Sequence, residues 1–220
     1  LGRKLMQTSN EYEIKWWSEG KEYIIGMDEA GRGPLAGPLV VAAVCFPKDF
    51  HHDEIYDSKK VSEKKREQMF EIIKQEALEY HIKVVTPKEI DELNIYRATQ
   101  KAMEDLVSEF KVVDGVLTDA MPLPHVSKDV IAIVKGDQKS VSIAAASILA
   151  KVARDEYMVE LDKLYPEYGF AKHKGYGTKA HYDALREFGP CPIHRRSLYC
   201  FREGPFKGFC NSQPCRYSAQ

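Results

Sequence analysis

The sequence predicts an α/β fold in which helices flank a mixed β-sheet, with a helical region toward the C-terminus. Five short apolar runs have the length and the β-branched content of strands, and longer segments repeat apolar residues at helical spacing. With 220 residues and 44% apolar side chains, the chain can bury the core of one large domain. Because strands and helices alternate, a sheet covered by helices is expected. The expected strands are 23–27, 39–46, 80–85, 112–118 and 130–134.

Helices are expected where a capping residue precedes apolar positions three and four residues apart. Ser62 can cap one helix, and Thr86 followed by Pro87 marks the start of a short one. A long helix from Ser140 is rich in alanine near its start, so that end should pack closely on its neighbour. The other expected helices are 95–110 and 178–188.

Three parts are expected along the chain. Residues 1–20 form an N-terminal extension in which Trp16 and Trp17 are the only large apolar feature, read either as a docked helix or as a partly ordered segment. Residues 21–197 form the main domain, including its helical part from about 140. Residues 198–220 form a basic, cysteine-containing tail with no assigned role.

Charge and hydropathy exclude several classes of protein. No run of 18 apolar residues occurs, and Leu1 is followed by no signal-like apolar segment, so an intracellular, cytoplasmic protein is expected. The net charge is −1, but residues 172–220 hold 9 Lys/Arg against 3 Asp/Glu, a net +6, and the rest holds 23 against 30, a net −7. This asymmetry is typical of a nucleic-acid enzyme with a carboxylate metal site, although an ordinary basic face would also produce it.

The cysteines favour reduced thiols. Cys45 lies in an apolar run and is expected to be a small buried hydrophobe. The other four gather near the C-terminus without a C-x-x-C pair, so the signal for structural zinc is weak. These four are Cys191, Cys200, Cys210 and Cys215.

Four acidic residues stand at or beside the ends of apolar runs. Asp28 and Glu29 follow the first run, and Asp119 and Asp137 follow two later ones. If the strand ends converge, four carboxylates meet, and divalent cations such as Mg²⁺ or Mn²⁺ would hold them together. Paired metal ions in such a site catalyse phosphoryl chemistry. A surface acidic pair and ordinary turn aspartates are the alternatives, and Asp114, before a glycine, is a rival for the third position.

Glycine-rich and basic loops supply candidate phosphate contacts. Gly31, Arg32 and Gly33 follow the acidic pair and would form a backbone-lined notch that grips a sugar-phosphate. Tyr176 stands between two glycines and is expected to be exposed, so its ring could stack on a sugar or base, although a packed loop tyrosine is the alternative. Lys174, just before this tyrosine, is a candidate phosphate contact. Lys59 and Arg195 lie in basic, hydroxyl-bearing loops that suit phosphates, and either loop could instead be a solvated turn.

Six segments of the chain resemble ribonuclease HII, the type 2 ribonuclease H family, in family order over about residues 22–197. The segments are GMDEAGRGPLAGPLVVAAV, DSKKVSEKKRE, TDAMPLP, IVKGDQKSVSIAAASILAKVARD, YGFAKHKGYGTKAH and GPCPIHRRS. The resemblance implies a ribonuclease H-like fold with a five-stranded mixed sheet and a helical C-terminal region. The last residues, 198–220, match no family pattern.

The resemblance also implies a function. It assigns the metal ligands to Asp28, Glu29, Asp119 and Asp137, the substrate clamp to the Gly31–Arg32–Gly33 triplet, and junction sensing to Tyr176. The expected reaction is hydrolysis of RNA paired to DNA, and incision 5′ of single ribonucleotides in duplex DNA, by two Mg²⁺ or Mn²⁺ ions. A monomer is expected, and a replication clamp is a candidate partner. A junction-resolving nuclease of the same fold and a non-catalytic nucleic-acid-binding module are the alternatives.

Overall fold

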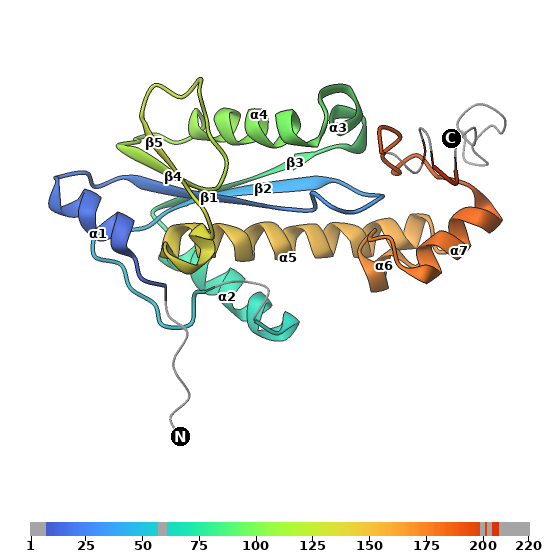
Figure 1. The fold of residues 1–220 in the computed structure, drawn as a ribbon. Coiled ribbons are helices and arrows are strands. Elements are labelled where there is room, and N and C mark those ends of the chain that lie inside the picture. Colours follow the sequence, from blue (N-terminus) through green and yellow to red (C-terminus); the bar gives the residue numbers. More distant parts are fainter. Residues whose placement is uncertain (1–7, 57–60, 199–200, 202–203, 207–220) are drawn as a thin grey trace. The chain divides into compact units, whose positions relative to one another are not determined.

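The computed structural model describes residues 8–56, 61–198, 201 and 204–206 (Figure 1). The chain divides into two compact units. The first unit contains the chain through Ala30, Val40–Lys83 and Thr99–Ala153. The second contains Gly31–Leu39, Val84–Ala98 and the chain from Arg154 onward.

A five-stranded mixed sheet has the order β3-β2-β1-β4-β5, which confirms the predicted fold class. Strand β1 pairs antiparallel with β2 and parallel with β4, and β4 pairs parallel with β5. The parallel pairing places the carboxyl ends of β1, β4 and β5 at the same edge of the sheet. The strands are β1 Ile24–Ala30, β2 Leu39–Cys45, β3 Glu79–Val85, β4 Gly115–Asp119 and β5 Asp129–Ile133.

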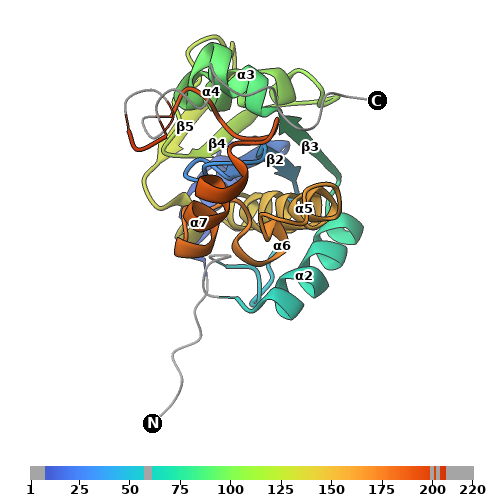
Figure 2. The same cartoon turned by 90° about the vertical axis from the view of Figure 1, so that its right-hand side faces the viewer.

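Helices cover both faces of this sheet in the first unit. Figures 1 and 2 show α2 (Glu63–Glu76) and the first part of α5 (Val141–Leu164) on one side, and α4 (Ile95–Val107) on the other. Alternate β2 side chains pack against α2 and the alanine-rich start of α5 in one buried cluster. The start of α5 passes so close to β1 that a Cβ at Gly26 would lie 2.2 Å from the backbone of Ser142. The predicted close packing of this helix is therefore confirmed.

The predicted helix starts at Ser62 and Thr86 are also confirmed. The Ser62 hydroxyl accepts a hydrogen bond from the Lys65 N–H, and α2 begins at Glu63. Thr86 and Glu89 form a capping box in which each side chain accepts a hydrogen bond from the other residue's backbone N–H. Helix α3 (Pro87–Leu93) begins directly after Thr86.

Helix α1 (Glu11–Ser18) docks on the sheet of the first unit. Of the two predicted alternatives, a docked helix or a partly ordered segment, the structure has the docked helix. Trp16 and Trp17 are both 5% exposed and join a buried cluster with residues of β1, β4, β5 and α5. The same segment caps the start of α5. The Asn10 side chain accepts the Val141 N–H at 3.0 Å, and Glu13 accepts the Ser142 N–H at 3.2 Å and the Ser140 hydroxyl.

Two predicted elements are shorter than expected. Strand β4 begins at Gly115 rather than at 112, since Asp114 turns its carboxylate to the backbone N–H groups of Glu22 and Tyr23. Helix α4 ends at Val107 rather than at 110, where the Ser108 hydroxyl binds the Asp105 carbonyl group.

The second unit has its own buried core around α7 (Lys179–Phe188). Its members include aromatic residues of the segment that leads into α7 and of the segment that follows it. The short helix α6 (Phe170–His173) and a 3₁₀ turn of the first unit, Gly136–Gln138, were not predicted, because both are too short to show a helical repeat.

Cys45 and Cys191 are buried and take no part in a disulfide, while Cys200, Cys210 and Cys215 lie outside the described residues. None of the helices that the structure describes is long and apolar enough to cross a membrane.

Candidate functional site

The first two candidate acids lie near the carboxyl end of β1. Side chains alternate along a strand, so Asp28 shares the face of Gly26, which is the face that packs on α5. Asp28 is 6% exposed, and its carboxylate accepts the Glu29 N–H at 2.7 Å and a hydrogen bond from Ser147 of α5. Glu29 lies on the opposite face and is half-buried.

The other two candidate acids lie at the same edge of the sheet. In the parallel register Met27 pairs with Thr118, so the next residues along, Asp28 and Asp119, lie side by side near the carboxyl ends of neighbouring strands. Asp119 accepts the Gly136 N–H at 2.9 Å, which ties the end of β4 to the turn that carries Asp137. Asp137 is 4% exposed and stands four residues before the start of α5.

Electrostatics couples three of these carboxylates. Burial raises the pKa of Asp28 well above its ordinary value, and the negative charges of Glu29 and then Asp119 raise it further. The two hydrogen bonds that Asp28 accepts oppose this shift. Like charges at a buried position destabilise the ionised form, and a bound cation would reverse that effect.

The donor chemistry of this edge fits a hard divalent cation. Carboxylate oxygens are the ligands that Mg²⁺ and Mn²⁺ prefer. As the side chains are placed, however, no three His, Cys, Asp or Glu residues of the described chain form a group that could hold one ion. Asp28 lies near enough to Glu29 and Asp119 for their charges to disfavour its ionised form, so a cation at this edge would relieve that repulsion.

Asp114, the rival third acid, lies at the opposite end of β4. Its carboxylate accepts the N–H groups of Tyr23 and Glu22, both at 2.9 Å, before β1 begins. These two hydrogen bonds hold the pKa of Asp114 below its ordinary value. Asp114 therefore anchors the start of the β1–β4 pair, and the geometry brings Asp119 rather than Asp114 to Asp28.

The glycine-rich loop 31–38 belongs to the second unit and lies against two buried arginines. Arg195 donates to the carbonyl groups of Gly31, Arg32, Gly37 and Pro38, at 2.6 to 3.1 Å. Arg154 donates to the carbonyl groups of Pro38 at 2.9 Å and Ala36 at 3.3 Å. Gly31 has φ +98°, and a Cβ there would lie 2.1 Å from Nε of Arg154, so only glycine fits.

Arg195 was predicted to be an exposed phosphate contact, but in the structure it is buried. Its side chain is 0% exposed and its hydrogen bonds go to backbone carbonyl groups, so it supports the loop from inside. Burial, and then the nearby charge of Arg154, lowers the pKa of Arg195 to about 9. A direct phosphate contact by this side chain is incompatible with such burial.

Tyr176 is exposed, as predicted, and lies beside the glycine-rich loop. Its side chain is 45% exposed, and its ring faces the Arg154 guanidinium, whose central carbon is 5.8 Å from the ring centre. A Cβ at Gly33 would lie 3.7 Å from the same ring. Lys174 is half-buried and its ammonium group donates to the Ala171 carbonyl group at 2.7 Å, and Lys59 lies outside the described residues.

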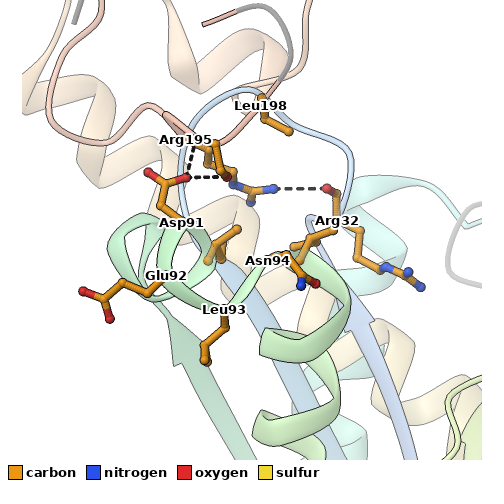
Figure 3. Close-up of a pocket in the computed structure, with 10 residues that line it drawn as sticks. Arg32, Asp91, Glu92, Leu93, Asn94, Arg195 and Leu198 are labelled. Carbon is orange, nitrogen blue, oxygen red and sulfur yellow. Dashed lines mark hydrogen bonds between the residues drawn. The ribbon is translucent and has the colours of Figure 1, made fainter. Parts of the chain in front are cut away.

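A pocket of about 300 Å³ adjoins Arg32 in the second unit (Figure 3). Its walls come from the end of α3 and the start of α4, together with Arg195, Ser197 and Leu198. Asp91 fixes one wall, because its carboxylate accepts the backbone N–H groups of Arg196 and Ser197. Figure 3 shows the Arg32 guanidinium at the edge of the pocket, directed away from Asp91.

Three buried residues near the loop were not found by sequence reasoning. Arg154 gave no signal, because it lies inside a long helix among ordinary charged positions. His181 and His194 are 0% and 1% exposed and bind each other at 3.0 Å. The position of His181 three residues after the helix-capping Thr178 was the one available sequence signal.

A mixed sheet with acidic residues at the converging ends of parallel strands defines a protein of the ribonuclease H-like class. The model of the family described as Ribonuclease HII matches residues 25–200, and the chain therefore belongs to the ribonuclease HII family of endoribonucleases. A "Ribonuclease HII" of Caldanaerobacter subterraneus subsp. tengcongensis is 54% identical over 195 residues, which cover 88% of this chain and 81% of that protein.

Two solved structures share the fold. The ribonuclease H2 of Pyrococcus horikoshii OT3 superposes with a TM-score of 0.68 at 27% identity, covering 80% of this chain and 93% of that one. The ribonuclease HII in a PCNA:RNase HII complex from Archaeoglobus fulgidus gives a TM-score of 0.67 at 26% identity, covering 79% and 93%.

Proposed function

We propose that this chain is an endonuclease that hydrolyses the RNA strand of RNA/DNA hybrids and cuts 5′ of single ribonucleotides embedded in duplex DNA. Membership of the ribonuclease HII family supports ribonuclease H activity. The observation that carries the proposed site is the position of Asp28 and Asp119 on neighbouring parallel strands, where the charge of Asp119 disfavours ionisation of Asp28.

Four side chains would hold the metal ions: Asp28, Glu29, Asp119 and Asp137. Two Mg²⁺ or Mn²⁺ ions, when bound, would activate the attacking water and stabilise the leaving 3′-oxygen. The chain's own contribution is geometric. Ser147 and the Glu29 N–H fix the Asp28 carboxylate, and the Gly136 N–H fixes that of Asp119. Water adds to phosphorus and the bond to the 3′-oxygen breaks, which leaves 3′-hydroxyl and 5′-phosphate ends.

Recognition of the ribonucleotide is proposed for the second unit. Because Arg195 and Arg154 bind the carbonyl groups of the loop from inside, the backbone around Gly31, Arg32 and Gly33 is held rigid for contact with a 2′-hydroxyl group. The exposed ring of Tyr176, beside Gly33, would pack on the deoxyribose that follows the ribonucleotide. Lys174 would contribute to a basic surface near this ring.

We also propose a role in ribonucleotide excision repair and DNA replication, a cytoplasmic location and a monomeric state. The PCNA complex of the Archaeoglobus protein supports a sliding clamp as a candidate partner.

The decisive test is a DNA duplex with one ribonucleotide, compared with an all-RNA/DNA hybrid and an all-DNA junction. Tyr176→Ala removes a stacking contact worth on the order of 1–3 kcal/mol, which predicts a roughly ten- to hundredfold loss at the single ribonucleotide and a smaller loss on the hybrid. Initial rates with Mg²⁺ measure both. Equal losses would remove Tyr176 from junction reading, cleavage of the all-DNA junction would favour a resolvase, and binding without turnover would favour a non-catalytic module.

A further inference from the structure

A chain of buried hydrogen bonds reaches the Tyr176 backbone from the segment that carries Cys191. The His181 Nδ1 atom lies 2.9 Å from the Tyr176 carbonyl oxygen, and its Nε2 atom lies 3.0 Å from Nε2 of His194. The His194 Nδ1 atom in turn lies 3.0 Å from the Cys191 backbone nitrogen and 3.2 Å from its sulfur. We call the two rings, with Cys191 and the Tyr176 carbonyl group, the histidine relay.

The partners assign the proton on each ring. The Cys191 N–H donates to Nδ1 of His194, so that nitrogen is unprotonated and the proton of the ring is on Nε2. His194 therefore donates to Nε2 of His181, which leaves His181 to donate from Nδ1 to the Tyr176 carbonyl group. Burial lowers the pKa of His181 to about 4 and of His194 to about 3, so both rings are neutral at physiological pH.

The relay acts on the same loops that flank Tyr176. The Tyr176 carbonyl group also accepts the Thr178 N–H at 2.8 Å, so two donors fix its orientation. The backbone beside His194 binds the glycine-rich loop, through Arg195 N–H to the Leu35 carbonyl group and Gly37 N–H to the Ile193 carbonyl group, both at 2.9 Å. One buried segment thus holds both the tyrosine loop and the loop that precedes β2.

We propose that His181 and His194 are positioning residues that set the Tyr176 ring for the ribonucleotide–deoxyribonucleotide junction. The inference rests on the proposed junction-reading function of Tyr176. Neither ring touches solvent, since His181 is 0% and His194 is 1% exposed, so both act through the backbone rather than on the substrate. If the hydrogen bond to the Tyr176 carbonyl group is lost, we expect the loop to stay folded and the Tyr176 ring to move out of position for the deoxyribose.

His194→Phe tests the relay, since phenylalanine keeps the aromatic packing against Tyr168, Phe170 and Phe201 and removes every ring hydrogen bond. The lost orientation of one buried group predicts a roughly five- to tenfold lower single-turnover rate on the single-ribonucleotide duplex, and less than about a twofold change on the all-RNA hybrid. His194→Gln can still donate to His181 and should recover most of the rate.

Tyr168→Phe is the matched control. It also removes a buried hydrogen bond from the same aromatic cluster, the one from the Tyr168 hydroxyl to the Gly189 carbonyl group at 2.7 Å, but the acceptor of this bond is not part of the histidine relay. Thermal unfolding of each variant monitors folding. Tyr168→Phe should lower both substrate rates equally or not at all.

The double variant His194→Phe/Tyr176→Ala separates the two proposals. If the relay works through the ring, His194→Phe adds no further loss once Tyr176 is alanine. An additive loss, or equal losses on both substrates for His194→Phe, would overturn the relay while leaving junction reading intact. If Tyr176→Ala itself fails to distinguish the substrates, the proposed junction reading is wrong and the relay proposal falls with it.

Discussion

The two units bury charged side chains in opposite ways. In the first unit, burial and the charges of Glu29 and Asp119 all raise the pKa of Asp28. In the second, Arg195 is equally buried, but backbone carbonyl groups surround its guanidinium. The loop carbonyl groups offset the burial of Arg195, even though the charge of Arg154 repels it. Asp28 instead has two further carboxylates near it, which make its ionised form less favourable.

The largest expected effect comes from the carboxylate centre. Asp28→Asn should lower the cleavage rate in Mg²⁺ by roughly 10³-fold, since a ligand for the reacting centre is lost. The thermal midpoint should stay equal or rise, because the amide removes the repulsion from Glu29 and Asp119. Initial rates and thermal unfolding measure both.

Metal addition provides a control for Asp28→Asn that does not depend on turnover. Saturating Mg²⁺ should raise the thermal midpoint of the wild-type protein by about 2–4 °C per kcal/mol of binding free energy, and that of Asp28→Asn by less. A folded Asp28→Asn variant with near wild-type activity would show that this edge of the sheet is not the metal site.

The second prediction compares the two ends of β4. Asp119→Asn should lower the rate about 100-fold, although its amide oxygen can still accept the Gly136 N–H and keep the fold. Asp114→Asn should change the rate little and should lower the stability, because the carboxylate that binds the Glu22 and Tyr23 N–H groups loses its charge. The reverse ranking of the two rates would contradict the assignment of the third acid.

The pH dependence of stability checks the role of Asp114 independently. Its pKa is lower in the folded protein than its ordinary value of 3.8, so its stabilisation is fully present above that value. It is lost as the pH falls through the folded pKa. The difference in thermal midpoint between wild type and Asp114→Asn should therefore shrink below about pH 4.

In the arginine-supported loop, the expected effect is on stability rather than on the cleavage rate. Gly31→Ala would place a Cβ 2.1 Å from Arg154 and 2.8 Å from the Pro38 carbonyl oxygen at a positive φ, so a loss of about 1–3 kcal/mol of stability is expected. Gly33→Ala meets only the Tyr176 ring, at 3.7 Å, and should fold normally. Chemical denaturation compares them, and equal losses would show that the arginines do not set the loop.

Local sequence signals were enough to predict the sheet, because apolar runs marked its strands. Asp28 and Asp119 lie on neighbouring parallel strands, while the predicted meeting of all four acids stays a prediction. The predicted metal-ligand and substrate-binding roles of these residues stay predictions. Tyr176 was predicted to be exposed because glycines flank it, and the structure confirms that exposure.

The supporting interactions could not be predicted, since their partners are distant in sequence. Arg195 binds Gly31 and Gly37 across 164 and 158 residues, and a backbone carbonyl group leaves no trace in the sequence. The sequence Arg195-Arg196-Ser197 therefore resembled an exposed phosphate-binding loop. The histidine relay was missed for the same reason, because its tautomers depend on backbone atoms of Cys191 and Tyr176.

The cap on α5 has a consequence for the order of events during synthesis. Asn10 and Glu13, which accept the N–H groups of Val141 and Ser142, leave the ribosome 131 and 129 residues before those partners do. Helix α1 is therefore synthesised before α5, and its acceptor side chains can bind the N–H groups of α5 only after that helix has been synthesised. Closing so long a loop is slow, so the first turn of α5, next to Asp137, should become ordered late in folding.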